Sequence, residues 1–354
     1  MTSGIQVLAI EFTKGYHVGW IRSEEIIDHL TILRSLIEIS GLTQHKYIIN
    51  AIVNGKLKST ALLPTHICKD TVKLLAPIPV TPLGLGVKKE YIRWSTLPAI
   101  KHIVEFAEKC VNKHGFIVLE SVSNREIVYK CRDRKSYSIL EDLRLELRGE
   151  PPIVCLTDID CDYICPDRRK YLEYFYEIRT RIDRITGSAD VYRVEGVQAH
   201  TPLWLALISS EEHLLEEVVK LMHILGDMGI GGYRSKGFGK FKTIDVKVVG
   251  DDLEILKKYT IWKEGYAYLL GSLPSTCSSI VTDFSYSSQR MLEGIGGNTF
   301  NQYYLPVIRL LDVGSLLYFE RGAKEPYYVI KLSPIGGLDH EPLIVFNPVM
   351  IHGF

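Results

Sequence analysis

The stretch GDMGIGGYRSKGFGKF, residues 226–241, contains six glycines among basic and aromatic residues. Because glycine loses more conformational freedom on ordering than any other residue, this density weakens both helices and strands. The segment is therefore predicted to be a loop whose backbone lies close against a bulky group. Arg234, Lys236 and Lys240 add positive charge, which favours a phosphate chain as that group.

The elements around this stretch argue against a nucleotide-binding loop. A helical pattern of buried leucines precedes it and stops at Gly226, and KFKTIDVKVV (240–249) follows it as a strand. Walker A and Rossmann loops have the opposite order, since they follow a strand and open a helix. In addition, Lys240 is followed by Phe241 where a Walker A loop needs Ser or Thr.

The remaining pattern predicts an α+β fold. Stripped of insertions, the expected elements follow the βαββαβ order of a ferredoxin-like domain. They are a strand at 6–12, a helix capped by Ser23 and stopped by Gly41, strands ending with 202–210, a helix up to Gly226, the glycine-rich loop and a strand at 240–249.

Two further regions are predicted around this plan. Residues from about 43 to 165 are expected to be insertions, with an Asn54-Gly55 hairpin and a helix over 97–114. Residues 250–354 are expected to form a second, strand-rich ferredoxin-like domain, so the first domain spans 1–249.

Composition excludes several classes of protein. The 354 residues include 42 Lys and Arg against 42 Asp and Glu, so the formal net charge is zero and a general polycation is excluded. No apolar run approaches the roughly 20 residues that span a bilayer, and the start of the chain lacks the basic lead of a signal peptide. We expect a cytoplasmic protein that contacts no membrane.

The seven cysteines are scattered and form no CxxC pair, which argues against a structural zinc site. Their odd number and spacing predict unpaired thiols in a reducing compartment. No metal and no cofactor are expected.

The glycine-rich stretch closely resembles the loop of the RAMP superfamily, the repeat-associated RNA-binding proteins of CRISPR systems. The family pattern is close to GxGGxxSxGFGxF, and this chain meets it with Gly229, Gly231, Gly232, Ser235, Gly237, Phe238, Gly239 and Phe241. In the family this loop joins the second helix of an RRM-like domain to its last strand. The resemblance therefore implies the RAMP architecture of two RRM-like domains.

Other segments narrow the resemblance within the superfamily. EFTKGYHVGW (11–20), RTRIDRITGSADVY (179–192) and LPVIRLLDVGSLLYFE (305–320) are similar to segments of the Cas five-group subunits of type III complexes, in particular the fourth subunit of Csm complexes. Ser23-Glu24 departs from the Ser-Asp pair of that group, and 100–165 matches no part of the family.

The resemblance implies a non-catalytic RNA-binding subunit of a type III-A (Csm) interference complex. Such a subunit holds the 5′ tag of the crRNA and bridges the large Cas ten-type subunit to a neighbouring RAMP backbone subunit. The residues expected to contact RNA are Gly229, Gly231, Gly232, Tyr233, Arg234, Ser235, Lys236, Gly237, Phe238, Gly239 and Lys240 in the loop, His17 and Arg22 after the first strand, and Arg179, Arg181 and Arg184 in a thumb-like hairpin. Inward packing is favoured for Phe238. For His17, a hydrogen-bonded loop position and RNA contact both stay open.

Three alternatives remain. A Cas six-like endoribonuclease would use His17, His29 or His45 as a general base, although those enzymes carry the glycine loop near the carboxy terminus. A target-cutting backbone subunit would need a catalytic aspartate. The candidates are Asp28, expected on the solvent face of a helix, and the cluster Asp158, Asp160 and Asp162. The third alternative is the Cas five-group subunit of another type III subtype.

Overall fold

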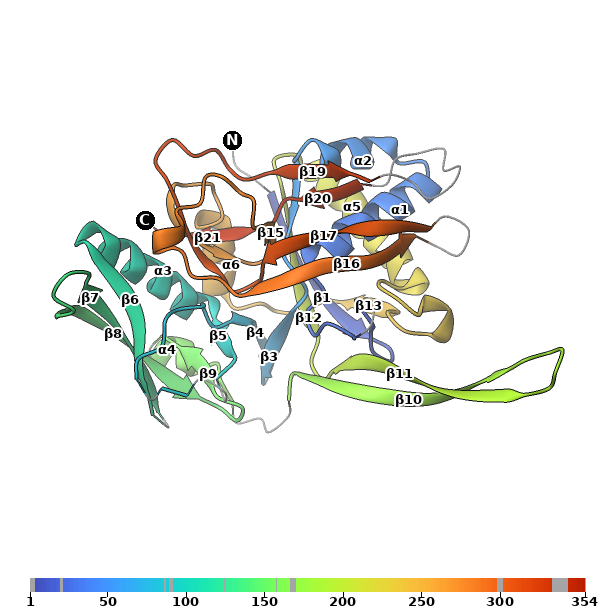
Figure 1. The fold of residues 1–354 in the computed structure, drawn as a ribbon, viewed down its shortest axis with the longest axis horizontal. Helices are drawn as coiled ribbons and strands as arrows, with labels where there is room; N and C mark the ends of the chain where they lie inside the picture. The colour runs from blue at the N-terminus through green and yellow to red at the C-terminus, as the bar shows by residue number, and fades with distance from the viewer. Residues whose placement is uncertain are drawn as a thin grey trace.

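The structure is a computed structural model that describes residues 4–19, 22–85, 87–88, 92–123, 125–156, 158–165, 170–297, 302–332 and 343–353. An eleven-stranded sheet runs through the molecule (Figure 1). Along its path the strands are β13 (Phe241–Ile244), β1 (Gly4–Phe12), β12 (Leu203–Ser209), β3 (Leu63–Cys68), β4 (Thr71–Pro77), β5 (Trp94–Thr96), β9 (Ile153–Cys155), β8 (Ile139–Arg148), β7 (Glu126–Asp133) and β6 (Gly115–Val122), while β2 (Leu57–Ser59) pairs with β12. The α+β class predicted from the sequence is confirmed.

The first part of the sheet carries the N-terminal elements. β1 lies between β12 and β13 and is antiparallel to both. Helices α1 (His29–Leu42) and α5 (Glu212–Met228) pack against each other, and α5 also packs on all three of these strands. Apolar residues of β1 and β12, such as Ile10 and Leu205, share one core with both helices because alternate strand residues point to the helical face.

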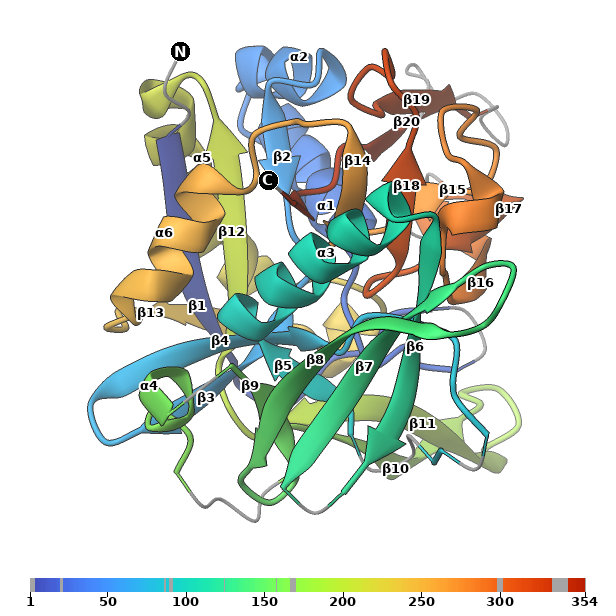
Figure 2. The same ribbon diagram turned by 90° about the vertical axis from the view of Figure 1, so that its left-hand side faces the viewer.

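The later part of the predicted insertion packs around one helix. α3 (Leu97–Asn112) begins at Thr96, whose hydroxyl accepts a hydrogen bond from Ala99 N (3.4 Å), and Pro98 occupies the first turn. Figure 2 shows α3 crossing the molecule between β6–β8 and the later elements α6 (Gly250–Lys258) and β14 (Gly265–Leu269). Apolar contacts therefore cross residue 250, and the domain division at that position stays a prediction.

The remaining strands form small antiparallel sheets. One contains β18 (Leu316–Phe319), β14 and β21 (Met350–His352), and another contains β15 (Leu273–Pro274), β17 (Gln302–Leu311) and β16 (Gln289–Gly297). β19 (Tyr328–Lys331) pairs with β20 (Leu343–Phe346). The segment 305–320, in the region predicted to be strand-rich, contributes to β17 and forms β18.

A long hairpin projects from the body of the molecule. β10 (Leu172–Ile182) pairs with β11 (Ala189–Ala199) along its whole length, and Figure 1 shows the hairpin extending past the rest of the chain at the lower right. Residues 180–193 are exposed on both faces. Arg179 and Arg181 lie on β10 and Arg184 lies in the turn, as the resemblance to a thumb-like hairpin implied.

Two local predictions are wrong. The first helix begins at His29 with Asp28 as its N-cap, and not at Ser23, because tertiary contacts hold residues 23 and 24 outside the helix. Asn54-Gly55 does not form a hairpin turn. It follows α2 (Lys46–Val53), with Asn54 as the C-cap. In the described part of the chain, no helix is both long and apolar enough to cross a bilayer.

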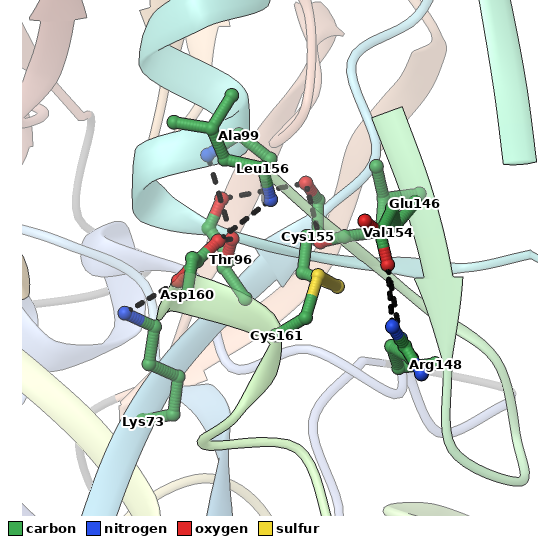
Figure 3. Close-up of a disulfide and its surroundings, with 11 residues drawn as sticks. Lys73, Thr96, Ala99, Glu146, Arg148, Val154, Cys155, Leu156, Asp160 and Cys161 are labelled. Atoms are coloured by element: carbon green, nitrogen blue, oxygen red, sulfur yellow. Dashed lines mark hydrogen bonds and ion pairs between the residues drawn. A yellow bond between two sulfur atoms is a disulfide. The ribbon is translucent and has the colours of Figure 1, made fainter. Parts of the chain in front are cut away.

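The prediction of unpaired thiols is also wrong. Six of the seven cysteines form disulfides, Cys68–Cys165, Cys110–Cys131 and Cys155–Cys161, and only Cys277 is free and buried. All three bonds lie in the region predicted as an insertion, and Figure 3 shows the third beside Asp160 and its ion pair with Lys73. Sequence spacing hid them because partners up to 97 residues apart meet only after folding.

Candidate nucleic-acid interface

The glycine-rich stretch forms a loop that folds back on itself between α5 and β13. Ile230 N donates to the carbonyl oxygen of Gly239 (3.0 Å), which closes the loop at its base. Gly239 N donates in turn to the carbonyl oxygen of Gly15 (2.8 Å), and Thr13 N donates to that of Lys240 (2.9 Å). The loop is thus fixed along the segment that follows β1.

Several of the glycines are needed by the chain's own backbone. At Gly239 (φ +74°) a Cβ would overlap with the carbonyl oxygen of Ile230, and at Gly231 (φ +80°) it would overlap with that of His17. At Gly226 a Cβ would lie 2.5 Å from the carbonyl oxygen of Phe241. Contact with the chain's own backbone is therefore enough to require glycine at these positions, and their expected approach to a phosphate chain stays a prediction.

Gly237 is different. Its φ of +86° favours glycine, yet a Cβ there would meet nothing within 4 Å. It follows the short 3₁₀ turn Arg234–Lys236 at the far end of the loop. Unlike Gly226, Gly231 and Gly239, Gly237 has a backbone that faces open space.

His17 is a hydrogen-bonded loop residue. Its side chain is 4% exposed, and its Nδ1 donates to the carbonyl oxygen of Glu195 in β11 (2.9 Å). The His17 ring lies 4.6 Å from the ring of Tyr233, centroid to centroid, and Gly232 N donates to the His17 carbonyl oxygen (2.7 Å). The first of its two open interpretations therefore fits the geometry. Trp20, in the same segment, lies outside the described residues.

A buried aromatic pair joins the loop to the hairpin. Phe238 is 0% exposed, and its ring stacks on Phe175 of β10 with a centroid distance of 5.6 Å and an interplanar angle of 3°. Gly196 of β11 makes the space, because a Cβ there would overlap with the Phe238 ring. The inward packing predicted for Phe238 is confirmed.

The same face of the hairpin carries charges beside the loop. Arg179 Nη2 donates to the carbonyl oxygen of Lys236 (3.1 Å) and pairs with Glu177 (2.7 Å). Lys14 pairs with Glu177 from the other side, and its ammonium nitrogen lies 5.1 Å from the centre of the Phe238 ring. Partial exposure leaves Lys14 and Arg179 open to solvent as well as paired.

Tyrosines lie among these cations. The Lys236 ammonium is 4.1 Å from the centre of the Tyr233 ring and 4.7 Å from that of Tyr192. On the opposite face of the hairpin, the Arg193 guanidinium carbon is 3.2 Å from the centre of the Tyr176 ring. Tyr176, Tyr192 and Tyr233 are all exposed in part, so their rings are accessible for stacking.

The other predicted residues fall into two groups. Arg234 is half-buried and pairs with Glu38 of α1 (3.1 Å), so its charge is largely engaged within the protein. The exposed ones are Arg22, Arg181, Arg184, Ser235 and Lys240. The structure therefore brings His17, Arg179 and the loop together, while Arg184 lies at the hairpin turn.

Sequence reasoning missed several residues of this surface, among them Lys14, Phe175, Tyr176 and Tyr192. For Phe175, a sequence signal was present in LEYFYEIRTRI (172–182). Period-two alternation there places Phe175, Glu177, Arg179 and Arg181 on one face of a strand.

The residues nominated for catalysis are mostly enclosed. His29 is fully buried, and Asp28 accepts hydrogen bonds from Arg290 (2.5 Å) and Ser272. Burial alone would raise the pKa of Asp28, but His29, Arg290 and Ser272 hold it well below its ordinary value. The expectation that Asp28 faces solvent is wrong, because it lies at the helix N-terminus against the C-terminal strands.

The aspartate cluster has another role. Asp160 is buried, pairs with Lys73 (2.6 Å) and accepts a hydrogen bond from Thr96 Oγ1 (2.5 Å), whereas Asp162 is exposed (Figure 3 shows Asp160). The side chain of Asp158 lies outside the described ones. Among the residues whose geometry is described, no group of three or more His, Cys, Asp or Glu side chains is arranged to hold a metal ion.

Comparison with known proteins identifies the fold. No protein-family model and no curated protein sequence matches the chain. A chain in the crystal structure of the Csm3-Csm4 subcomplex of the type III-A CRISPR-Cas interference complex is similar over 99% of both chains, with 13% identity and a TM-score of 0.54. Chains from a type III-B Cmr-beta complex bound to cognate target RNA and AMPPnP (11% identity, 88% and 86% covered, TM-score 0.44) and from a Csm1-Csm4 cassette with pppApApA (11% identity, 99% of both chains, TM-score 0.36) are also similar.

The chain therefore shares, over its full length, the fold of a chain in the Csm3-Csm4 subcomplex. At the level of the fold, the resemblance drawn from the glycine-rich loop is confirmed.

Proposed function

We propose that this chain is a non-catalytic RNA-binding subunit of a type III CRISPR effector complex, corresponding to the fourth subunit of a Csm complex. The observation that carries the proposal is the joint surface formed by the glycine-rich loop, the segment after β1 and the base of the β10–β11 hairpin. We call it the loop–hairpin surface, made of residues 13–17, 174–181, 190–196 and 229–240.

The sheet order supports the RAMP assignment. When β2 and β3 are taken together as the second strand, β13-β1-β12-β2/β3 is the 4-1-3-2 order of a ferredoxin-like, RRM-like domain. The glycine-rich loop then joins the second helix, α5, to the last strand, β13, as the family pattern requires. For residues 250–354, the antiparallel sheet β18-β14-β21 is the candidate centre of a second such domain.

The side chains of the loop–hairpin surface suit single-stranded RNA. Lys14, Arg179 and Lys236 lie side by side along one face of the hairpin, with exposed Arg181 next along the strand. Cations neutralise phosphates without reading sequence, and tyrosine rings stack on unpaired bases. A chain with zero formal net charge needs such a local patch to bind RNA at all.

The absence of catalysis is part of the proposal. The buried positions of His17, His29 and Asp28 keep these three side chains away from a ribose hydroxyl, which counts against them as catalytic groups. His45 is partly exposed and Asp162 is exposed, so the two nuclease alternatives are tested by the cleavage assay below. A Cas five-group subunit of another type III subtype would carry the same binding role. The full-length similarity to a chain of the Csm3-Csm4 subcomplex favours type III-A.

The proposed partners follow from this assignment. They are the 5′ tag of the crRNA, the large Cas ten-type subunit and a neighbouring RAMP backbone subunit. A 5′-end clamp at the loop–hairpin surface leaves the rest of the chain for contacts between subunits.

The test is RNA binding by the purified chain. RNA that begins with the repeat-derived tag of the host is compared with a scrambled RNA of equal length across a series of salt concentrations. Arg181→Ala and Lys236→Ala should each weaken binding several-fold and lower the slope of log K against log salt by about 0.7, the value for one phosphate contact on a single strand. Lys258→Ala is the matched control, an exposed lysine on α6.

Equal affinities for wild type, Arg181→Ala and Lys236→Ala, with the same salt slope, would refute the proposal. Cleavage of the tagged RNA by the purified chain would favour the Cas six-like alternative, and it should be absent both with and without added divalent metal.

A further inference from the structure

A buried charge cluster lies at the start of α1, outside the loop–hairpin surface. Arg290 of β16 contacts three carboxylates: Asp28 through Nη2 (2.5 Å), Glu24 through Nη1 (3.0 Å) and Asp312 through Nε (2.9 Å). Its side chain is only 18% exposed. On the other side, His29 Nδ1 lies 2.7 Å from Asp28. One guanidinium group therefore links the N-terminal segment to β16 and to the residue that follows β17.

Arg290 is the cation that all three carboxylates share. Burial raises the pKa of Glu24 to about 6, while Arg290 opposes that rise. Burial would lower the pKa of Arg290, but Asp28, Glu24 and Asp312 raise it above its ordinary value. Three carboxylates around one guanidinium leave excess negative charge, so removal of Arg290 would place the carboxylates against one another.

The segment held by Arg290 reaches the loop–hairpin surface. Glu24 N donates to the carbonyl oxygen of Val18 (2.6 Å), and the Tyr16 hydroxyl donates to that of Glu25. Ser23 N donates to Glu195 Oε1 in β11 (2.8 Å).

Val18 and His17 then meet the glycine-rich loop. A Cβ on Gly231 would lie 3.0 Å from Val18 Cγ2, and Gly232 N bonds the His17 carbonyl oxygen. The contacts thus run from Arg290 through Glu24 and Val18 to the loop, and through Ser23 to the hairpin.

The side chain of Asp28 also serves the charge cluster and does not cap the helix. It occupies the N-cap position of α1, where a carboxylate ordinarily accepts a hydrogen bond from the backbone of the first turn. Its side chain makes no such bond. The side chain is committed to Arg290, His29 and Ser272, whose backbone and hydroxyl groups both donate to it.

We propose that Arg290 is a positioning residue for RNA binding, which holds the segments 16–19 and 22–25 and through them the loop–hairpin surface. The inference rests on the proposed function for its binding readout. Arg290 itself contacts no RNA in this proposal, so its loss alters affinity by displacing the surface and not by removing a phosphate contact.

The experiment compares Arg290→Met with Arg290→Lys and with the neutralised variant Arg290→Met/Glu24→Gln/Asp312→Asn. Arg290→Met should bind tagged RNA about tenfold more weakly at pH 8 with an unchanged salt slope. Arg290→Lys should recover part of the affinity, and the neutralised variant most of it, because like charges no longer repel.

A pH series separates positioning from a general structural defect. The titratable and charged groups of the cluster are Glu24, Asp28, His29, Arg290 and Asp312. The pKa of Glu24 is about 6 with Arg290 in place, and loss of Arg290, which lowers that pKa, raises it further in Arg290→Met. Protonation of Glu24 then relieves the repulsion in the variant, so the ratio of wild-type to variant affinity should fall as the pH goes from 8 to 5.5. A ratio that stays constant over this range, with no recovery in the neutralised variant, overturns the proposal.

Hydrogen exchange keeps the test independent of the proposed function. In Arg290→Met, backbone amides at 16–19, 22–25 and 230–239 should exchange faster, while those of α3 stay as in wild type. If wild type fails to bind tagged RNA but these amides still respond, the proposed function fails and the positioning of the loop stands. If amide exchange in the segment after β1 and in the glycine-rich loop is unchanged in Arg290→Met, the positioning role is refuted whatever the binding result. Faster exchange of all amides, including those of α3, also counts against this role. If Arg290→Met does not fold, Glu24→Gln is the milder variant, because it removes only one of the three ion pairs of Arg290. In it, the backbone amides at positions 18 and 24 should exchange faster than in wild type.

Discussion

Two glycines in the same loop allow steric crowding to be separated from backbone strain. Gly237 and Gly239 both have positive φ, +86° and +74°, so alanine is strained at each by roughly 1–2 kcal/mol. At Gly237 the Cβ meets nothing within 4 Å, whereas at Gly239 it overlaps with the carbonyl oxygen of Ile230 and lies 3.0 Å from that residue's N and C atoms. The two substitutions therefore share the cost of backbone strain, and only Gly239→Ala adds a steric overlap.

The difference follows from the hydrogen bonds at Gly239. To make room, the loop must release the bond from Ile230 N to Gly239 O and the bond from Gly239 N to Gly15 O, at about 1 kcal/mol each. Alanine also stabilises both variants by about 0.4–1 kcal/mol through the unfolded chain. Gly237→Ala should then cost about 1 kcal/mol and Gly239→Ala about 3 kcal/mol, a gap of about 2 kcal/mol.

Urea unfolding of the two variants measures this gap. With an m-value of about 3 kcal/mol/M, the midpoints should differ by roughly 0.7 M. RNA binding should show the reverse order at equal folded fraction, because Gly237 is the glycine whose backbone is open to an approaching phosphate. Coincident urea midpoints would refute the assignment of Gly239 to internal packing, and a Gly237→Ala variant with wild-type RNA affinity would remove Gly237 from the interface.

Two other predictions concern the disulfides and the buried ion pair between Lys73 and Asp252. In denaturant without reductant, one thiol per chain, that of Cys277, should react with a thiol reagent, and seven thiols should react after reduction. Reduction should also lower the melting temperature, because the disulfides that close loops of 97 and 21 residues stabilise the fold by about 3–5 kcal/mol each. More than one reactive thiol before reduction would show that at least one pair is open. Burial raises the pKa of Asp252 from 3.8 to about 7 beside Lys73, so its contribution to stability is fully present below pH 4 and is lost as the pH rises to about 7. Asp252→Asn should therefore flatten the dependence of the urea midpoint on pH between 4.5 and 7.5, by about 2–4 kcal/mol in total, and a slope equal to that of wild type would contradict the shifted pKa.

The sequence predicted the elements whose signals are local. The strand at 6–12, the helix over 97–114 and the helix before Gly226 are all present, because apolar periodicity decides each within its own window. The α+β class and the place of the glycine-rich loop followed from the order of these elements.

The start of α1 could not be read in this way. Ser23 followed by Glu24 and Glu25 has the composition of a helix N-terminus. In the fold, Ser23 N bonds Glu195 and Glu24 pairs with Arg290, so two partners far along the chain keep these residues out of the helix. A local preference worth about 1 kcal/mol was outweighed by contacts that no single-sequence pattern displays.

The glycine pattern led to the right fold with an incomplete physical reason. Gly226 makes room for Phe241 of β13, Gly231 for His17 of the segment after β1, and Gly196 of the hairpin for Phe238. Each of these glycines therefore lies where two elements of the chain are in close contact. The spacing of the loop glycines reflects the packing of α5, β13 and the segment after β1. A sequence shows that a backbone must approach something closely, but it does not show whether that partner is RNA or another part of the chain. The motif identifies this fold because most of its glycines serve the packing, which holds the loop rigid and leaves Gly237 and its neighbouring cations as the part that can meet a ligand.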